Sequence, residues 1–543
     1  MKKGLLIVAF NFGFLISFSQ SFTSSNLPIV IINTNGQAIP DDPKITADMG
    51  IIYNGAGVRN NLADPVNHYN GKIGIEIRGK SSQMFPMKSY SLELRDVAGS
   101  SINRVILGMP SESDWVLYAP YTDKTLMRNF LAYTMSREMG RWAARCQFVE
   151  VVINDDYKGI YVLMERIKRG SSRVPVTKMT STDISGDAVT GGYIFSIDKE
   201  DPDDDGWYSS VRPDGTYGAQ TIRYLYYYPK AVDIAPAQKA YIKSYVDSFE
   251  NVLKGNDFQN SVTGWRKFAD ANSFIDYFLV NEVSRNVDAY RLSAFFYKNR
   301  NSINTKIMAG PVWDYDLAFR NADYCSGSNI NGWSYEFNSV CSGDFWLVPF
   351  WWDRFFQDTA FKASLRCRWK QLRQTSLSDQ RINFIIDSVN TLVSEAQQRH
   401  FQRWPILGQY VWPNPQPIPT TYAGEISELK SWIAARLKWI DENIPNVGAC
   451  FDWLANDAGT FKVSIAPNPF SNSPAIKILS KLSQTVSIQV NDAAGRVVYR
   501  KNVTVSPGLN DISIAAGRWQ RGIYFFRVNA AGNEKSLFKL VKQ

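Results

Sequence analysis

The stretch NVDAYRLSAFFYKNRNSINTKIMAGPVWDYD, residues 286–316, decides the fold of this chain. Inside it, two strand-like runs around 294–298 and 306–308 predict a pair of short strands. The segment before it, 273–284, carries apolar residues at three- and four-residue steps and predicts a helix. The predicted order is therefore a helix followed by two short strands, with acidic residues at both ends of the strand pair.

These acidic residues are Asp288, just after the helix, and Asp314 and Asp316, just after the second strand. A carboxylate in a cleft costs free energy unless it is paired or ligates a metal, so the three suggest a divalent cation site. Hard oxygen ligands favour Mg²⁺, usually with phosphate oxygens completing its shell. An aspartate, two short strands and a metal-binding aspartate form the order of kinase-like phosphotransfer sites, with an upstream strand lysine such as Lys88. Helix-capping and ion-pair roles for the three aspartates remain alternatives.

The regions on either side of this stretch predict an α+β chain that ends in an all-β module. From residue 27 to about 175 the pattern is mostly strand, with a helix after Asp123 as its possible cap and a hairpin over 148–166. From 346 to 444 the chain is helical and rich in Trp. At helical spacing these Trp residues favour core packing over a carbohydrate platform. The last 80 or so residues are short alternating strands and predict a small β-sandwich.

Composition excludes several classes of protein. The chain has 543 residues and only two histidines, His68 and His400, so a three-histidine zinc site and the HExxH protease motif cannot be built. Its net charge of +9 is confined to residues 461–543, and the preceding 460 residues are electrically balanced. Without a long basic run, nucleic-acid binding is not expected.

The N-terminus predicts export. Residues 1–19 read as a signal peptide, with Lys2 and Lys3 before an apolar stretch, and no later window is apolar enough to span a membrane. Export permits disulfides, and Cys325 and Cys341 bracket a polar loop that a bridge could close. The domains expected are a main domain over 27–448, a linker over 449–460 and the sandwich over 461–543.

Two further motifs are weak. Residues 74–81 satisfy the GxxxxGK[ST] pattern of a P-loop, but they alternate like a strand and another strand follows, whereas a P-loop leads into a helix. Such a turn can still present N–H groups and cations to phosphate. Residues 201–206 match half of an EF-hand loop, but Arg212 stands where a bidentate Glu is required, so an acidic solvated turn is expected.

Six blocks in order along the chain resemble the CotH kinase family over roughly residues 27–446. They are IRGKSSQ (77–83), FPMKSY (85–90), SDWVL (113–117), DKTLMRN (123–129), GIYVLME (159–165) and WDYDLAF (313–319). The resemblance implies an atypical protein-kinase-like domain that uses ATP and Mg²⁺ to phosphorylate Ser or Thr, with a Ser/Thr-rich protein as substrate.

The same resemblance implies roles for individual residues. Asp288 resembles the catalytic aspartate and Asp314 the metal-binding aspartate. Lys88 resembles the lysine that holds phosphates, Arg78 is a candidate phosphate contact, and Glu165 is expected near the adenine.

The chain departs from the kinase pattern at two positions. Ser293 stands where ordinary kinases place a metal-binding Asn, and Asp316 is the candidate replacement ligand. Arg320 stands where a Gly is expected. The glutamate that pairs with the lysine in ordinary kinases has no clear position in this sequence, and Glu138 is one candidate for it.

The C-terminal module resembles a type A sorting domain of type IX secretion. The resemblance rests on APNPF (466–470), GRVVY (495–499), GIYF (522–525) and the ending KLVKQ (539–543). It implies export by the type IX machinery to the cell surface or the medium. Because ATP is scarce outside cells, a catalytically silent surface protein for adhesion or matrix assembly, possibly glycan-binding, is the alternative to a secreted kinase.

Overall fold

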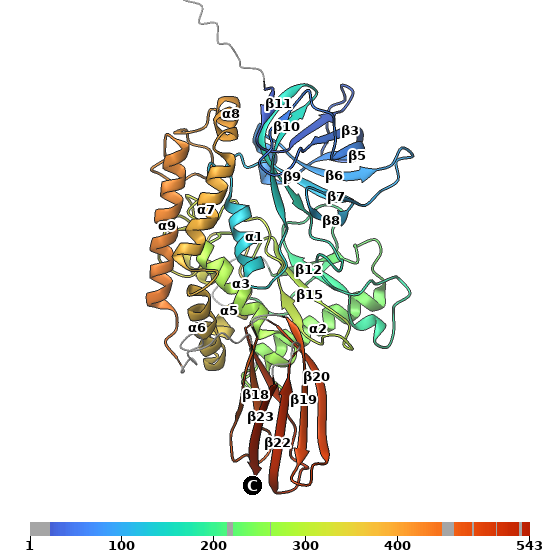
Figure 1. The fold of residues 1–543 in the computed structure, drawn as a ribbon, viewed down its shortest axis with the longest axis vertical. Helices are drawn as coiled ribbons and strands as arrows, with labels where there is room; N and C mark the ends of the chain where they lie inside the picture. The colour runs from blue at the N-terminus through green and yellow to red at the C-terminus, as the bar shows by residue number, and fades with distance from the viewer. Residues whose placement is uncertain are drawn as a thin grey trace, which may run out of the picture.

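The computed structural model describes residues 22–213, 221–260, 262–447, 461–480, 483–506, 508–530 and 535–543. The predicted signal peptide and linker lie outside these residues. Three parts follow one another in Figure 1: a β-rich part at the top, a mixed part in the middle flanked by long helices, and an all-β part at the bottom.

The top part is a closed seven-stranded barrel with the strand order β10-β11-β9-β6-β5-β3-β2. Its strands are antiparallel except where β2 runs parallel to β10 and closes the ring. The strands are β2 (Ile29–Asn33), β3 (Ile45–Ile52), β5 (Tyr69–Arg78), β6 (Ser89–Arg95), β9 (Asp114–Tyr118), β10 (Cys146–Ile153) and β11 (Asp156–Glu165). Alternate residues such as Ile73 and Ile75 of β5 are fully buried in the barrel core. The predicted hairpin over 148–166 is confirmed as β10 and β11.

Short elements decorate the barrel. They are β1 (Ser24–Ser25) paired with β4 (Asn60–Asn61), β7 (Arg104–Ile106) paired with β8 (Met109–Glu112), and the 3₁₀ turn η1 (Ser81–Met84). Since β1 precedes residue 27, the folded part begins a few residues earlier than expected.

The middle part is built on a five-stranded antiparallel sheet of order β13-β14-β12-β15-β16. Its strands are β12 (Tyr193–Ile197), β13 (Gly206–Tyr208), β14 (Arg223–Tyr228), β15 (Ala294–Lys298) and β16 (Ile307–Ala309). The last two are the strands predicted inside residues 286–316. Three helices accompany the sheet, α1 (Arg128–Glu138), α2 (Pro236–Lys254) and α3 (Ala271–Ser284), with 3₁₀ turns η2 (Ala188–Thr190) and η3 (Trp265–Lys267).

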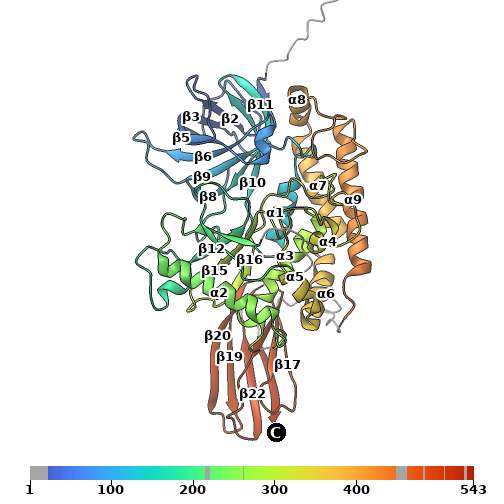
Figure 2. The same cartoon turned by 180° about the vertical axis from the view of Figure 1, so that it is seen from behind.

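A helical region follows and stands as a column beside the barrel and the sheet in Figures 1 and 2. Its elements are η4 (Ser334–Glu336), α4 (Phe337–Val340), α5 (Trp351–Gln357), α6 (Thr359–Arg373), α7 (Asp379–Val393), α8 (Ala396–Arg403) and α9 (Tyr422–Asn443). Trp351, Trp352 and Trp369 are at most 1% exposed and pack into the large core. The core-packing interpretation of these Trp residues is therefore confirmed.

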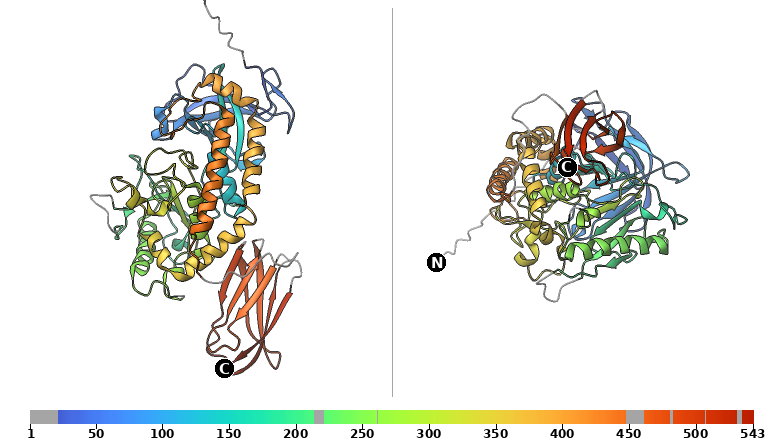
Figure 3. Two further views of the ribbon diagram at one scale, coloured as in Figure 1. Left: turned by 90° about the vertical axis from the view of Figure 1, so that its left-hand side faces the viewer. Right: turned by 90° about the horizontal axis from the view of Figure 1, so that it is seen from below.

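The C-terminal part consists of two sheets, β17-β18-β21 and β20-β19-β22-β23. The strands are β17 (Phe461–Ala466), β18 (Ala475–Ser480), β19 (Gln484–Asp492), β20 (Val497–Val505), β21 (Gly508–Ser513), β22 (Gly522–Asn529) and β23 (Lys535–Lys542). Side chains from both sheets, among them Ile476, Ile488 and Phe526, share one core. The predicted sandwich is confirmed, and Figure 3 shows it as a separate body at one end of the molecule.

Two local predictions have different outcomes. Cys325 and Cys341 form the predicted disulfide. The expected cap at Asp123 is wrong, because α1 begins only at Arg128, and Leu126 between them takes a left-handed conformation (φ 64°) that a helix cannot include. Asp123 instead accepts hydrogen bonds from the backbone N–H groups of Thr125 (3.1 Å) and Arg128 (2.7 Å).

Candidate active site

A cleft of about 960 Å³ lies between the barrel and the middle sheet. The barrel contributes residues at the ends of its strands, including Arg78, the last residue of β5, and Tyr118, the last residue of β9. The opposite wall contributes Asp198, which follows β12, and the segment that carries Asp288 and Ser293. Asp314 and Asp316 also line the cleft. The structure thus brings the three sequence-predicted aspartates into one cleft.

Asp288 is positioned by the end of helix α3 and by an arginine. Arg285, in a left-handed conformation (φ 44°), ends the helix and turns the chain toward the cleft. The Arg291 guanidinium then donates to Asp288 Oδ1 (3.0 Å) and also to Asp344 Oδ1 (3.1 Å). Burial raises the pKa of Asp288, and the charge of Arg291 partly offsets this rise.

The loop of Asp314 is held by helix α1. The backbone N–H of Asp314 donates to the hydroxyl oxygen of Tyr133 (3.1 Å), and that of Tyr315 donates to Asn129 Oδ1 (2.6 Å). Asp314 itself has a left-handed backbone (φ 62°) and opens into the cleft. Such strained conformations persist only where the surrounding structure enforces them, and they cluster at functional sites.

The carboxylates influence one another electrostatically. Burial, followed by the negative charges of Asp288 and Asp198, raises the pKa of Asp314 to about 6. The pKa of Asp316 is raised well above its ordinary value, first by burial and then by Asp314 and Asp288. Groups that repel each other in this way bind a cation favourably, because the cation removes the repulsion.

The aspartates do not form a closed metal cage. Within the described residues, only Cys325, Cys341 and Asp344 place three ligand atoms within 4.8 Å of one another, and the disulfide removes both thiolates from that set. A more open arrangement suits Mg²⁺, which is commonly bound by one or two carboxylates together with substrate phosphates. The donor set of the cleft therefore fits a cation that arrives with a phosphorylated ligand.

Cationic side chains line both walls of the cleft, with Lys199 after β12 of the middle sheet and the others on the barrel side. Arg78 lies over the Trp313 ring, 5.5 Å from its centroid, while Arg166, Lys80 and Lys199 also line the cleft. Positive charge from Arg78 and Lys199 lowers the pKa of Asp314 against the larger effect of burial. The cleft thus combines anionic and cationic groups, as a site for a metal-bound phosphate requires.

The turn after Arg78 is not a P-loop. Residue 74 lies in the middle of β5, and the turn leads through η1 into strand β6 instead of into an α-helix. Gly79 has φ +98°, a value that favours glycine, and it lines the cleft with Lys80, Ser81 and Ser82. The weaker expectation, a turn that presents cations and N–H groups to the site, agrees with this placement.

Three residues named from the sequence, Lys88, Glu138 and Glu165, do not line the cleft. The Lys88 amine donates to the backbone oxygen of Gln83, and Lys88 does not line the cleft. Glu138 pairs with Arg381 of α7, not with Lys88.

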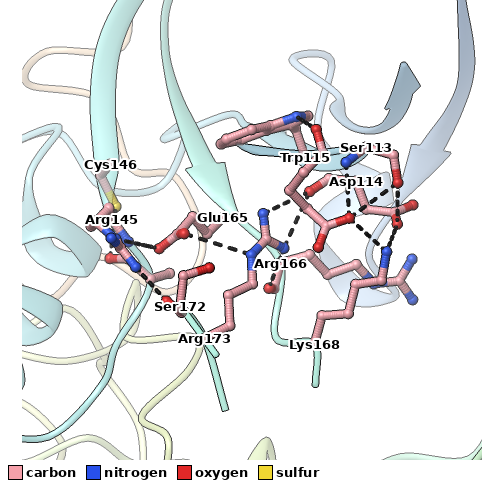
Figure 4. A network of polar contacts seen from close by, with 12 residues as sticks. Ser113, Asp114, Trp115, Arg145, Cys146, Glu165, Arg166, Lys168, Ser172 and Arg173 are labelled. Atoms are coloured by element: carbon pink, nitrogen blue, oxygen red, sulfur yellow. Dashed lines mark hydrogen bonds and ion pairs between the residues drawn. The ribbon is translucent and has the colours of Figure 1, made fainter. Parts of the chain in front are cut away.

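Glu165 is fully buried and also absent from the cleft lining. It accepts from Arg145 Nε (2.9 Å) and lies 3.6 Å from Arg173 Nε. Figure 4 shows this carboxylate between the two arginines. Its neighbours give it a structural role in joining β11 to the following loop.

The acidic turn at 201–206 forms part of the rim. Asp201, Asp203 and Asp204 line the cleft mouth, and Asp201 lies 3.1 Å from Lys80 across it. No calcium-type cluster of three ligands forms there among the described residues. The solvated-turn interpretation agrees with this arrangement.

Sequence reasoning missed Asp198, Asn129 and Tyr118, which also line the cleft. Asp198 follows the apolar run YIFSI of β12 directly, as Asp314 follows the strand around β16, so the same strand-then-Asp signal was present. Asn129 lies within the quoted block 123–129, but nothing in its spacing marks its side chain as a cleft residue.

Comparison with known families gives two matches. The family described as CotH kinase protein matches residues 75–440, about two thirds of the chain. The chain belongs to the CotH kinase family. A secretion system C-terminal sorting domain matches residues 464–543, which are the sandwich. This CotH family protein therefore carries the sorting signal of type IX secretion, which implies export to the cell surface or outside.

Comparison with individual proteins adds little. A search of the curated proteins gives no match. Among solved structures, the chain is 20% identical to dimeric latent PorU from Porphyromonas gingivalis over 17% of its own length and 10% of that chain, with a TM-score of 0.14. It is 11% identical to a β-glucosidase from Listeria innocua in complex with glucose, over 18% of each chain, with a TM-score of 0.13. The chain thus spans less than a fifth of either structure.

Within the described residues, no helix of this CotH family protein has both the length and the apolar character needed to cross a membrane.

Proposed function

We propose that this protein is a secreted or surface-bound atypical protein kinase that transfers the γ-phosphoryl group of ATP to Ser or Thr of exported proteins. The observation that carries the proposal is that one cleft collects Asp288, Asp314 and Asp316 with Arg78, although 28 residues of sequence separate the first aspartate from the last.

The residues of the cleft suit Mg²⁺ and ATP. When bound, ATP supplies the phosphoryl group and Mg²⁺ neutralises its developing charge. Asp314 and Asp316 are the proposed cation ligands, and Arg78 the proposed partner of phosphate oxygens. Asn129 supports this assignment, because it is 2% exposed and its Nδ2 atom has no hydrogen-bond partner among the described residues. A buried donor without a partner is costly unless a ligand oxygen accepts from it.

Asp288 is the proposed general base. Its raised pKa makes its carboxylate a better proton acceptor than a solvated aspartate. Arg291 holds the carboxylate in place, so Asp288 can orient a substrate hydroxyl and accept its proton. Arg78 stabilises the negative charge that develops on transfer. The proposal assigns Lys88 and Glu165 structural roles, since neither lines the cleft.

The test is transfer of labelled phosphate from ATP to a Ser/Thr-rich acceptor protein. The wild-type chain is expected to label the acceptor in the presence of Mg²⁺, whereas Asp314→Ala and Asp288→Asn should fold normally and lose transfer. Asp257→Asn, at an exposed residue that does not line the cleft, is the matched control and should retain transfer. Equal transfer by Asp288→Asn and wild type would reject the assignment of the base.

A catalytically silent surface protein is the second candidate, and the position of Lys88 favours it. The lysine that holds phosphates in kinases has its counterpart here bonded to a backbone oxygen outside the cleft. The two candidates differ in ligand binding, because a ligand that binds the native state raises its melting temperature. A shift on adding Mg²⁺ and ATP supports the kinase, and an unchanged melting temperature supports the silent protein.

A further inference from the structure

Ser293 stands where ordinary kinases place their metal-binding Asn, and its side chain contacts an acidic residue. The Ser293 hydroxyl donates to Asp198 Oδ2 (3.2 Å). Strand register explains the contact, since Ile197 pairs with Ala294 in the antiparallel β12–β15 ladder and the two polar residues come next to each other just beyond it. A carboxylate is therefore held beside a position that a kinase would give to a metal ligand.

Asp198 keeps a lone pair with which it can bind a cation. Its Oδ1 accepts from the backbone N–H of Lys199 (2.8 Å) and its Oδ2 from Ser293. The backbone N–H of Ser293 also donates to this carboxylate. Its two oxygens offer about four lone pairs, so about one remains for a further partner. The side chain lines the same cleft as Asp288 and Asp314, so that partner can come from the cleft.

An independent observation indicates that a ligand belongs beside these carboxylates. The side chain of Asn129 lines the cleft, is 2% exposed and has an Nδ2 donor with no partner among the described residues. Its Oδ1 is already used by the N–H of Tyr315, next to Asp314, so the amide is fixed with Nδ2 left over. A fixed, buried donor beside carboxylates calls for an anionic oxygen, such as that of a phosphate bound through a cation.

We infer that Asp198 is a ligand of the divalent cation, shared with Asp314, and that Ser293 is the positioning residue that fixes the Asp198 carboxylate. In this arrangement the cation lies between the strand ends after β12 and β16, with phosphate oxygens facing Asn129. Ser293 thereby acts through Asp198, in place of the direct ligand that an Asn would be. The inference rests on the proposed function, because it concerns the same cation and phosphate.

The test measures cation binding and not catalysis. Binding of Mn²⁺, which accepts the same oxygen ligands as Mg²⁺, is followed by electron paramagnetic resonance on the full chain with a non-hydrolysable ATP analogue. Loss of a partner of a metal ligand typically weakens binding about 10- to 100-fold. Ser293→Ala is expected to weaken Mn²⁺ binding by about 10-fold, and Asp198→Asn is expected to weaken it by at least as much. Asp257→Asn makes the same charge change at an exposed residue that does not line the cleft, and this variant should bind within about two-fold of wild type.

The outcomes separate this inference from the proposed function. If the wild-type chain binds no Mn²⁺ with the nucleotide, the proposed function falls and this inference falls with it. If wild type binds and Asp198→Asn binds as tightly as Asp257→Asn, Asp198 has no part in cation binding, and the inference is overturned while the proposed function stands. Circular dichroism verifies that each variant is folded. If Asp198→Asn does not fold, the Mn²⁺ affinity of Ser293→Ala is the deciding measurement. An affinity equal to that of wild type overturns the positioning role of Ser293.

Discussion

Replacing Arg291 by Met removes the guanidinium that holds Asp288, and the cost can be worked from its contacts. Arg291 is 2% exposed and donates to Asp288, to Asp344 and to the backbone oxygen of Val287 (2.8 Å). Breaking a buried ion pair by removing one partner costs about 3–5 kcal/mol. Because the Asp288 and Asp344 side chains are each 22% exposed, water can partly replace the arginine, and we expect the lower end, about 3 kcal/mol.

The assay is urea unfolding of the full chain followed by Trp fluorescence. Fourteen of the sixteen tryptophans precede residue 448, so the signal reports mainly on the domain that holds the cleft. The matched control is Arg381→Met, which breaks the surface pair with Glu138, whose side chains are 41% and 23% exposed. Such pairs contribute about 0.2–1 kcal/mol.

Two results would refute the reasoning. The first is that Arg291→Met lowers the free energy of unfolding by no more than Arg381→Met, which would show that the guanidinium does not hold the two carboxylates. The double variant Arg291→Met with Asp288→Asn removes the charge left unpaired and should recover about 1 kcal/mol. Strictly additive losses would show that the two side chains are not coupled.

Three further predictions follow from other groups. Protons compete with the cation below the raised pKa of Asp314, about 6, so Mg²⁺ binding with an ATP analogue should weaken about ten-fold from pH 7.5 to 5; a constant affinity by calorimetry contradicts this. His400 is fully buried with its pKa lowered to about 3, so only the unfolded chain takes up its proton, and the free energy of unfolding should fall by up to about 1.4 kcal/mol per pH unit from about pH 6.5 toward 3. His400→Gln should flatten that slope in urea titrations between pH 7 and 5, and identical slopes would disprove the assignment. Replacing both Cys325 and Cys341 by Ala opens a loop with a sequence separation of 16 and should cost about 3 kcal/mol of unfolding free energy; an unchanged urea midpoint would show that the bridge does not stabilise the domain.

Local elements could be predicted where a single short window carries the signal. Strand β15 has the predicted bounds, 294–298, and β16 lies within one residue of its prediction. The region 346–444, predicted to be helical, contains α7, whose buried Ile382, Ile386 and Val389 recur at three- and four-residue steps. The disulfide could also be predicted, because its two cysteines flank one polar loop.

Long-range pairing could not be predicted in this way. The barrel closes because β2 pairs with β10, more than a hundred residues later in the chain. No residue pattern in either strand identifies the other as its partner. Lys88 has the expected position beside a strand, yet the turn before β6 directs its amine to Gln83. The spacing of the acidic residues likewise could not show that Asp198, just after β12, lies beside Ser293.

The sequence by itself determined the family, the succession of strands and helices, the sorting module and the three aspartates, because each depends on residue types and spacing over short distances. Only the tertiary structure decided that Asp198 and Asn129 join those aspartates and that Lys88 and Glu165 do not. The physical reason is that side-chain neighbours across the cleft are set by strand register and core packing, which sum contributions from segments far apart in the chain.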